Sequence, residues 1–232
     1  MNSYAVSPPT QAYLDIVGTE KKFPVRRIYC IGKNYLAHVR EMEQDERDPP
    51  VIFMKPADAI VRNGGVIPYP VFTNNFHYEC ELVVVLKSGG YNITETNASS
   101  HIFGYAVGLD MTRRDHQAAA LANGLPWEVT KAFDQSAPIG PVTRADDMGI
   151  MSTGHVRLQV NGETRQDDDI SLLIWKIDEI IAKLSEQYEL TAGDIIMTGT
   201  PAGVGAVATG DLLDCSVDGL APMQVRIGGP AA

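Results

Sequence analysis

Residues 79–86 read ECELVVVL, and this stretch predicts a β-strand that enters the core of the protein. Polar and apolar residues alternate at first and then give way to an apolar run, as expected for a strand that becomes buried on both faces. Because side chains in a strand alternate between its faces, Glu79 and Glu81 share one face while Cys80 lies on the other. Two carboxylates this close repel each other. Either solvent on that face or a hard divalent cation would offset the repulsion, and the two glutamates alone leave both interpretations open.

Other segments of the chain carry similar signals. Strands are predicted at five further segments, namely residues 26–31, 51–55, 104–109, 157–160 and 195–198. Asn161-Gly162 follows one of these segments and favours a tight type I′ turn, so a hairpin is expected there. Helices are predicted at residues 34–43, 113–123 and 172–188, the last with apolar side chains at helical spacing along one face. Strands outnumber helices, so the predicted fold class is α+β with a large β component.

The domain organisation is predicted to be simple. Residues 1–25 contain scattered prolines and no clear periodicity, and we expect an irregular lead-in there. The rest of the chain shows no internal repeat, low-complexity tract or break in composition, which indicates a single domain over residues 26–232. A chain of 232 residues is long enough to bury a core of substantial size.

The charge of the chain narrows the class of function. The formal net charge is −10, which disfavours binding to nucleic acid or to anionic membrane surfaces. The same charge would repel a small anionic substrate, unless a bound metal ion or a cluster of Lys and Arg residues recruits it locally. A site of that kind is therefore worth seeking in the sequence.

The cysteines, the N-terminal residues and the apolar runs indicate the cellular compartment of the protein. Cys30, Cys80 and Cys215 are far apart, odd in number and in no C-x-x-C arrangement, so neither a disulfide framework nor a zinc knuckle is expected. Residues 1–20 contain no Lys or Arg and no apolar h-region, so no signal peptide is expected. No apolar run approaches the roughly 18–20 residues that a membrane span needs. These features predict a soluble, cytoplasmic protein with reduced thiols.

Asp110 is the third carboxylate of interest. It ends the predicted strand at 104–109, where a polar side chain can reach into a site. Arg113 and Arg114 follow it and are able to hold anionic groups through bidentate hydrogen bonds. Asp is also favoured at the N-cap of a helix, so a purely structural role is an alternative. Together with the two glutamates, Asp110 makes a site for a hard divalent cation such as Mg²⁺, Mn²⁺ or Ca²⁺ a reasonable prediction.

A second candidate group is His38 with Glu41. These residues lie three positions apart on the predicted helix at 34–43 and therefore share a face. A carboxylate beside an imidazole orients the ring and favours its protonated form, which gives a general acid–base pair. A glycine precedes this segment and two prolines end it, so a mobile lid over residues 32–48 is also a hypothesis.

Two further features could interact with an anionic ligand. Lys131 lies among apolar residues and can face an anionic intermediate, although exposure on the surface is the commoner fate of a lysine. The loop at residues 198–205, TGTPAGVG, offers backbone N–H groups. It matches neither a P-loop nor a dinucleotide-binding fingerprint. The other histidines, at positions 77, 101, 116 and 155, show no paired spacing and are expected to be structural or exposed.

These pieces together resemble the fumarylacetoacetate hydrolase family from about Arg26 to the C-terminus. The residues that carry the resemblance are, in chain order, Gly32-Lys33-Asn34-Tyr35 with His38 and Glu41, Tyr78-Glu79-Cys80-Glu81-Leu82, Gly108-Leu109-Asp110-Met111-Thr112-Arg113-Arg114-Asp115 with Gln117, Lys131-Ala132-Phe133-Asp134, Pro138-Ile139-Gly140-Pro141, Val160-Asn161-Gly162-Glu163 with Gln166, and Thr198-Gly199-Thr200-Pro201-Ala202-Gly203-Val204-Gly205. The short N-terminus resembles the small acylpyruvase branch of the family. Pro24-Val25-Arg26-Arg27 and Trp127-Glu128 are similar to its bacterial fumarylpyruvate hydrolases.

The resemblance implies a mixed β-roll or barrel with a few flanking helices, assembled as a homodimer. It implies Mg²⁺ or Mn²⁺ as the cofactor, and it assigns roles to nine residues. These are Glu79, Glu81 and Asp110 as metal ligands, His38 and Glu41 as the water-activating pair, Lys131 as the active-site lysine, and Arg114, Gln117 and Thr200 as substrate-pocket residues. Lys33 stands where many relatives have Arg, and Cys80 fills a position that is more often apolar.

The activity that the resemblance implies is hydrolysis of a C–C bond in an acylpyruvate. Fumarylpyruvate, cleaved to fumarate and pyruvate in gentisate-type breakdown of aromatic acids, is the expected substrate. The same site would also suit decarboxylation of oxaloacetate or isomerisation of a 2-oxo acid, since both need a stabilised enolate. A non-catalytic β-domain braced by a metal ion is a more remote alternative.

Overall fold

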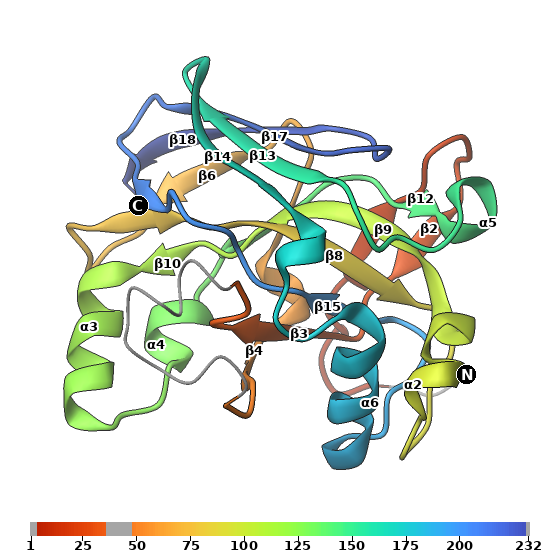
Figure 1. The fold of residues 1–232 in the computed structure, drawn as a ribbon. Coiled ribbons are helices and arrows are strands. Elements are labelled where there is room, and N and C mark those ends of the chain that lie inside the picture. Colours follow the sequence, from red (N-terminus) through yellow and green to blue (C-terminus); the bar gives the residue numbers. More distant parts are fainter. Residues whose placement is uncertain (1–3, 36–47, 231–232) are drawn as a thin grey trace.

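The computed structural model describes residues 4–35 and 48–230, and it is built mainly from β-strands (Figure 1). The β-rich α+β prediction is confirmed. Most of the predicted helix at 34–43 and of the proposed lid at 32–48 lies outside the described residues, and so do His38 and Glu41.

The largest sheet has eight strands. Their order is β4 (Val51–Lys55), β3 (Arg27–Gly32), β15 (Asp194–Met197), β8 (Cys80–Leu86), β9 (Ile102–Leu109), β11 (Ala137–Ile139) and β5 (Ile60–Arg62), with β12 (Thr143–Arg144) also paired to β9. The strand that the ECELVVVL stretch predicts is therefore β8, and it lies in the middle of this sheet.

A second, five-stranded sheet packs over β8 and β9 (Figure 1). Its order is β14 (Glu163–Asp169), β13 (His155–Val160), β17 (Leu212–Val217), β18 (Met223–Pro230) and β6 (Val66–Tyr69). The predicted hairpin joins β13 to β14, and its turn residues Asn161 and Gly162 both have positive φ, 53° and 84°. These angles are the ones that a type I′ turn requires, so the prediction is confirmed. A small sheet of β10 (Thr112–Arg113), β7 (Phe76–Tyr78) and β16 (Gly205–Ala206) lies beside them.

Strand β8 is buried along its whole length because apolar layers cover both of its faces. Leu82 and Val84 belong to the larger core cluster, which the second sheet closes. Val83 and Val85 belong to a smaller cluster on the opposite face. This burial explains the uninterrupted apolar run in the sequence.

The N-terminal segment is more regular than the sequence indicated. Within the supposedly irregular residues 1–25, β1 (Tyr13–Asp15) pairs antiparallel with β2 (Lys22–Pro24). Leu14 and Phe23 are buried and cover the smaller core cluster. The expectation of an irregular lead-in is thus wrong at this hairpin, because three-residue strands are too short to show a periodicity.

Within residues 4–35 and 48–230, the helices are few and short. They are α2 (Glu95–Ala98), α3 (Arg114–Asn123), α4 (Glu128–Lys131), α5 (Ala145–Met148) and α6 (Ile177–Gln187), with 3₁₀ turns η1 (Ala57–Ala59), η2 (Ser99–His101) and η3 (Ile170–Leu172). The helix predicted at 113–123 is confirmed as α3. The one predicted at 172–188 begins later, at Ile177, where the side chain of Glu179 accepts the backbone N–H of the extended residue Lys176 at 2.8 Å.

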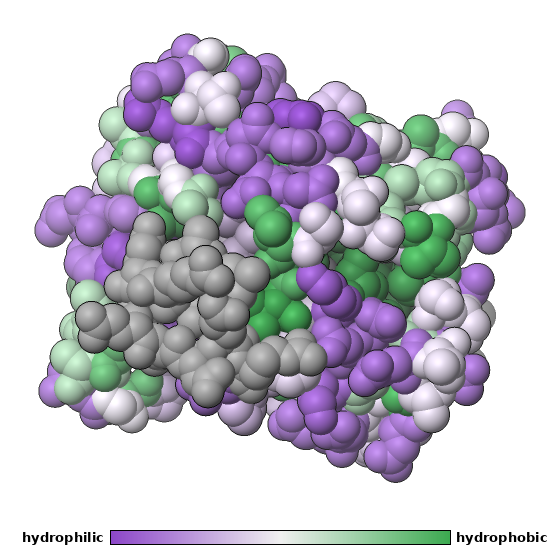
Figure 2. Space-filling view, viewed as in Figure 1, coloured by the Kyte–Doolittle hydropathy of each residue, from purple (hydrophilic) through white to green (hydrophobic). Residues whose placement is uncertain are grey.

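The face drawn in Figure 2 is largely hydrophilic at its upper and lower right edges, and hydrophobic residues gather near its middle. Among the described residues, no helix is long and apolar enough to cross a membrane.

Candidate functional site

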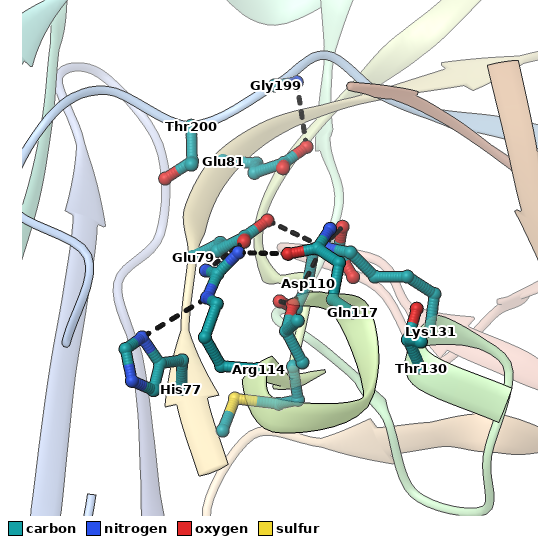
Figure 3. Close-up of polar contacts among 12 residues, drawn as sticks. His77, Glu79, Glu81, Asp110, Arg114, Gln117, Thr130, Lys131, Gly199 and Thr200 are labelled. Carbon is teal, nitrogen blue, oxygen red and sulfur yellow. Dashed lines mark hydrogen bonds and ion pairs between the residues drawn. The ribbon is translucent and has the colours of Figure 1, made fainter. Parts of the chain in front are cut away.

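The register between β8 and β9 brings three carboxylates together. Cys80 lies opposite Leu109, and the ladder continues one step further, since the N–H of Asp110 donates to the carbonyl of Glu79 at 2.8 Å. Residues opposite each other in an antiparallel pair share a face, so Asp110 joins the face of Glu79 and Glu81. Carboxylate oxygens of the three residues lie within 4.8 Å of one another (Figure 3).

All three carboxylates are shielded from solvent. The exposed fractions are 7% for Glu79, 2% for Glu81 and 1% for Asp110. Cys80 points to the opposite face, where its Sγ lies 3.6 Å from the carbonyl oxygen of Arg157 on β13. The solvated interpretation of the two glutamates is therefore wrong, and Asp110 caps no helix. Buried negative charges at this spacing need cations to stabilise them.

Lys131, at the end of α4, is the first of these cations. Its ammonium group lies 2.7 Å from Glu79 Oε2, 2.7 Å from Asp110 Oδ2 and 2.7 Å from Thr112 Oγ1. Burial acts to lower the pKa of Lys131, but the charges of Asp110 and Glu79 outweigh it and leave the pKa raised. The side chain is thus a buried cation inside the site and not an exposed surface lysine.

Lys55 is a second buried cation, and the sequence did not single it out. It ends β4, and its ammonium lies 2.8 Å from Asp110 Oδ1, as an ion pair that lacks good hydrogen-bond alignment. It also donates to the backbone carbonyls of Met111 and Lys131. Lys55 therefore ties the strand end that bears Asp110 to the helix that bears Lys131.

Arg114 is the third cation. Its guanidinium donates to Glu79 Oε1 at 2.5 Å and also to the side-chain carbonyl of Gln117, one turn further along α3. Burial acts to raise the pKa of Glu79, but Lys131 and Arg114 together bring it down to about 2. His77 accepts a long bond of 3.4 Å from Arg114 Nε, and burial followed by the charge of Arg114 lowers the pKa of His77 to about 4.

Glu81 differs from the other two carboxylates. Within the described residues it has no ion pair, and its one hydrogen bond comes from the N–H of Gly199 at 2.8 Å. Burial raises the pKa of Glu81 well above its usual value, and the charges of Asp110 and Glu79 raise it further. Gly199 has φ of 102°, and an added Cβ would lie 2.8 Å from that of Asn34, so only glycine directs its N–H here without strain.

The donor set fits a hard divalent cation. Three carboxylates offer only oxygen ligands, and their mutual distances allow one ion to contact all of them. Glu81 in particular has no cation partner within the described residues, so its ionised form would gain most from a bound ion. Glu79, Glu81 and Asp110 are thus the residues that would hold Mg²⁺ or Mn²⁺.

Thr200 and Gln166 form a clamp around the strand that carries the glutamates. The Thr200 hydroxyl donates to the carbonyl of Cys80 at 2.8 Å and accepts from Gln166 Nε2 at 2.8 Å. Gln166 Oε1 accepts the N–H of Cys80 at 3.0 Å, and its Nε2 also donates to Pro201 O. Figure 3 shows the hydroxyl of Thr200 directed away from Lys131, and its hydrogen bonds brace the strand between the glutamates.

Replacing Gln166 with Leu is expected to lower the free energy of unfolding by about 3 kcal/mol, because it leaves buried backbone groups of Cys80 and Pro201 without partners. Urea denaturation would measure the change. Gln159→Leu, at an exposed position on the adjacent strand β13, is the matched control. A loss no larger than that of the control would contradict the clamp.

The site opens into a cavity of about 230 Å³. Its lining residues are Ile31, Gly32, Lys33, Phe53, Glu79, Glu81, Asp110, Arg114, Gln117, Ala118, Leu121, Trp127, Lys131 and Thr200. The structure therefore brings the predicted metal ligands together with Lys131, Arg114, Gln117 and Thr200. His38 and Glu41 lie outside the described residues, so their predicted roles stay predictions.

Comparison with known proteins identifies a family and several relatives that resemble this chain. The fumarylacetoacetate (FAA) hydrolase C-terminal family matches residues 27–228. A fumarylpyruvate hydrolase of Ralstonia sp is 40% identical over 176 residues, which cover 76% of this chain and 91% of the relative. The human mitochondrial oxaloacetate tautomerase FAHD1 is 38% identical over 205 residues, 88% of this chain and 93% of that protein.

A solved structure agrees in both fold and sequence. The crystal structure of fumarylpyruvate hydrolase from Pseudomonas aeruginosa in complex with Mn²⁺ and pyruvate is 47% identical, with a TM-score of 0.95 over 97% of this chain and 99% of that one. The family therefore matches most of this chain, at residues 27–228, and the relatives above share 38–47% of their residues with it. The chain belongs to the fumarylacetoacetate hydrolase family.

Proposed function

We propose that the protein is a metal-dependent hydrolase that cleaves the C–C bond of an acylpyruvate, with fumarylpyruvate as substrate and fumarate and pyruvate as products. The observation that carries the proposal is the buried cluster of three carboxylates beside Lys131 and Arg114, at one end of a cavity. The relative of 47% identity that was solved with Mn²⁺ and pyruvate supports it.

The charges of the site suit an anionic 2-oxo acid. Lys55, Lys131 and Arg114 form ion pairs with Glu79 and Asp110, and their three positive charges balance the three carboxylates when Glu81 is ionised as well. A bound Mg²⁺ or Mn²⁺ would act as a Lewis acid, attracting the 2-oxo acid and stabilising the negative charge that develops on it. These six groups and the ion would then carry a surplus of two positive charges, and Lys33 also lines the cavity, so the site suits an anionic substrate despite the net charge of −10.

Side chains of the protein would stabilise the developing charge and orient the substrate. The ammonium of Lys131 has three hydrogens, and all of them are engaged by Glu79, Asp110 and Thr112. Lys131 therefore acts on developing charge as a fixed positive centre and not as a free hydrogen-bond donor. Arg114, held by Glu79 and Gln117, lines the same end of the cavity, where it is placed to orient a carboxylate.

The test is a product assay with purified protein and Mg²⁺ or Mn²⁺, against fumarylpyruvate, acetylpyruvate and oxaloacetate. Hydrolysis yields fumarate plus pyruvate. Decarboxylation yields CO₂ plus pyruvate, and isomerisation yields no fragments. A chelator should abolish turnover while the circular dichroism spectrum of the fold is retained, and added Mn²⁺ should restore it. Absence of fumarate and pyruvate from fumarylpyruvate would refute the proposal.

Water activation is assigned to His38 with Glu41 from the sequence alone, on their spacing and on the family resemblance. Replacing His38 with Ala is expected to lower kcat by about a hundredfold or more, because general base catalysis is lost, while the affinity for Mn²⁺ stays near that of the parent. The exposed His155, replaced in the same way, is the control. Near-normal kcat in His38→Ala would show that another group is the base.

A second candidate function has one observation in its favour. The human relative FAHD1, 38% identical, is an oxaloacetate tautomerase. The same cluster of charges would stabilise an enolate of oxaloacetate without attack by water, so His38→Ala would keep this activity. The ratio of the two activities in the product assay decides between them.

The assembly and cellular setting are also proposed, by resemblance to the family. We propose a homodimer in the cytoplasm that serves the catabolism of aromatic acids. Light scattering coupled to size-exclusion chromatography should then give twice the chain mass of 25.2 kDa. A mass equal to that of one chain would exclude the dimer.

A further inference from the structure

The cavity is lined by two chemically different sets of groups. One set is the three carboxylates with Lys131 and Arg114, and Lys33 lines the cavity as well. The other set is apolar or aromatic and has no role in the proposed chemistry. Its members are Ile31, Gly32, Phe53, Ala118, Leu121 and Trp127. A 2-oxo acid held by the carboxylate cluster would therefore share the cavity with an apolar surface.

Two aromatic rings define this surface. The ring centroids of Phe53 and Trp127 are 5.5 Å apart at an interplanar angle of 54°. The ammonium of Lys131 lies 5.2 Å from the centroid of Phe53, so this ring is close to both Lys131 and Trp127. An aromatic face therefore lies beside Lys131 in the cavity.

The local backbone fixes the two rings relative to the site. The carbonyl of Trp127 accepts the N–H of Lys131 at 2.9 Å, so the first turn of α4 sets the ring and the ammonium in one rigid unit. Phe53 comes from β4, the strand that Lys55 ends. A Cβ added to Gly32 would lie 3.4 Å from Trp127 and 3.5 Å from Phe53, which is ordinary van der Waals contact, so both rings lie beside the backbone at Gly32.

We propose that Phe53 and Trp127 form the acyl-chain subsite and make the enzyme selective for planar, unsaturated acyl groups. This inference rests on the proposed function and adds the residues that set its specificity. A flat conjugated chain stacks on an aromatic face over its full area, whereas a saturated or shorter chain does so less well. Oxaloacetate has no acyl chain beyond its polar atoms and gains nothing from this surface.

The kinetic test compares substrates within each variant. Phe53→Leu and Trp127→Leu keep an apolar side chain but remove the aromatic face. We expect kcat/KM for fumarylpyruvate to fall by about tenfold relative to kcat/KM for acetylpyruvate in either variant. Trp175→Phe, at a tryptophan that does not line the cavity, is the matched control and should leave the ratio unchanged. Equal losses for both substrates would overturn the subsite.

A binding measurement separates this inference from the proposed function. The chain has two tryptophans, so Trp175→Phe leaves Trp127 as the sole tryptophan reporter. Rapid mixing with fumarylpyruvate and Mn²⁺ should quench its fluorescence more strongly than acetylpyruvate does. Trp127→Phe, which retains Trp175, corrects for light absorbed by the ligands. If no substrate is cleaved but this selective quenching occurs, the subsite stands and the proposed hydrolysis fails. Cleavage with equal quenching by both ligands overturns the subsite alone.

Discussion

Replacing Glu81 with Gln is expected to remove binding of Mn²⁺ and to lower kcat/KM by about a thousandfold, the equivalent of about 4 kcal/mol of transition-state stabilisation. Glu81 is the one carboxylate of the three that has no cation partner within the described residues. Gln has the same shape and can still accept the N–H of Gly199, so the loss would follow from the missing charge and not from misfolding.

Isothermal titration with Mn²⁺ and thermal unfolding in a chelator together test this variant. Without metal, Glu81→Gln should unfold at a temperature no lower than the parent, because it removes a buried charge that is costly to keep. With Mn²⁺ the order should reverse, since only the parent gains stability from the ion. Asp134→Asn, at an exposed carboxylate near the site in sequence, is the control. Retention of parental Mn²⁺ affinity in Glu81→Gln would remove Glu81 from the metal site.

Replacing Lys131 with Met is expected to lower turnover without weakening the binding of Mn²⁺. Turnover should fall by about a thousandfold, because the fixed positive charge beside the developing anion is lost. Affinity for Mn²⁺ should stay the same or rise, since Glu79 and Asp110 lose the cation that competes for their oxygens. A residue that merely held the fold together would weaken both properties.

Steady-state kinetics and titration with Mn²⁺ measure the two effects on the same preparation. Lys183→Met, at an exposed lysine on α6, is the matched control. A variant of Lys131 that loses metal affinity in parallel with kcat would show that the lysine acts by organising the ligands.

The sequence predicts the strand that carries Glu79 and Glu81 better than it predicts which strand pairs with it. The ECELVVVL stretch gives β8 almost to the residue, and alternation places Glu79 and Glu81 on one face. The pairing of Glu79 with Asp110 depends on the register between β8 and β9, which a long connection through α2 and η2 leaves open. The position of Asp110 at the end of an apolar strand made it a candidate, and the family resemblance then assigned it as the third ligand.

The cations of the site were harder to predict, because tertiary packing decides their position. Lys131 ends a four-residue helix that has no measurable periodicity. Lys55 ends a strand and looks like an ordinary boundary residue, yet it is buried and paired with Asp110. Its one sequence signal was a lysine directly after the apolar run 51–54. Gln166 belonged to a family motif. Its hydrogen bond to Cys80 joins two different sheets, and no local sequence pattern predicts such a contact.

The position of β8 between two apolar layers has a consequence for hydrogen exchange. A strand buried on both faces in the middle of an eight-stranded sheet belongs to the part of a protein whose amides exchange last. The ligands at its start are held by that slow-exchanging segment and by the bonds of Gln166 and Thr200 to Cys80. The carboxylates are therefore in place before an ion arrives, so capture needs little ordering of the chain and release needs no local unfolding.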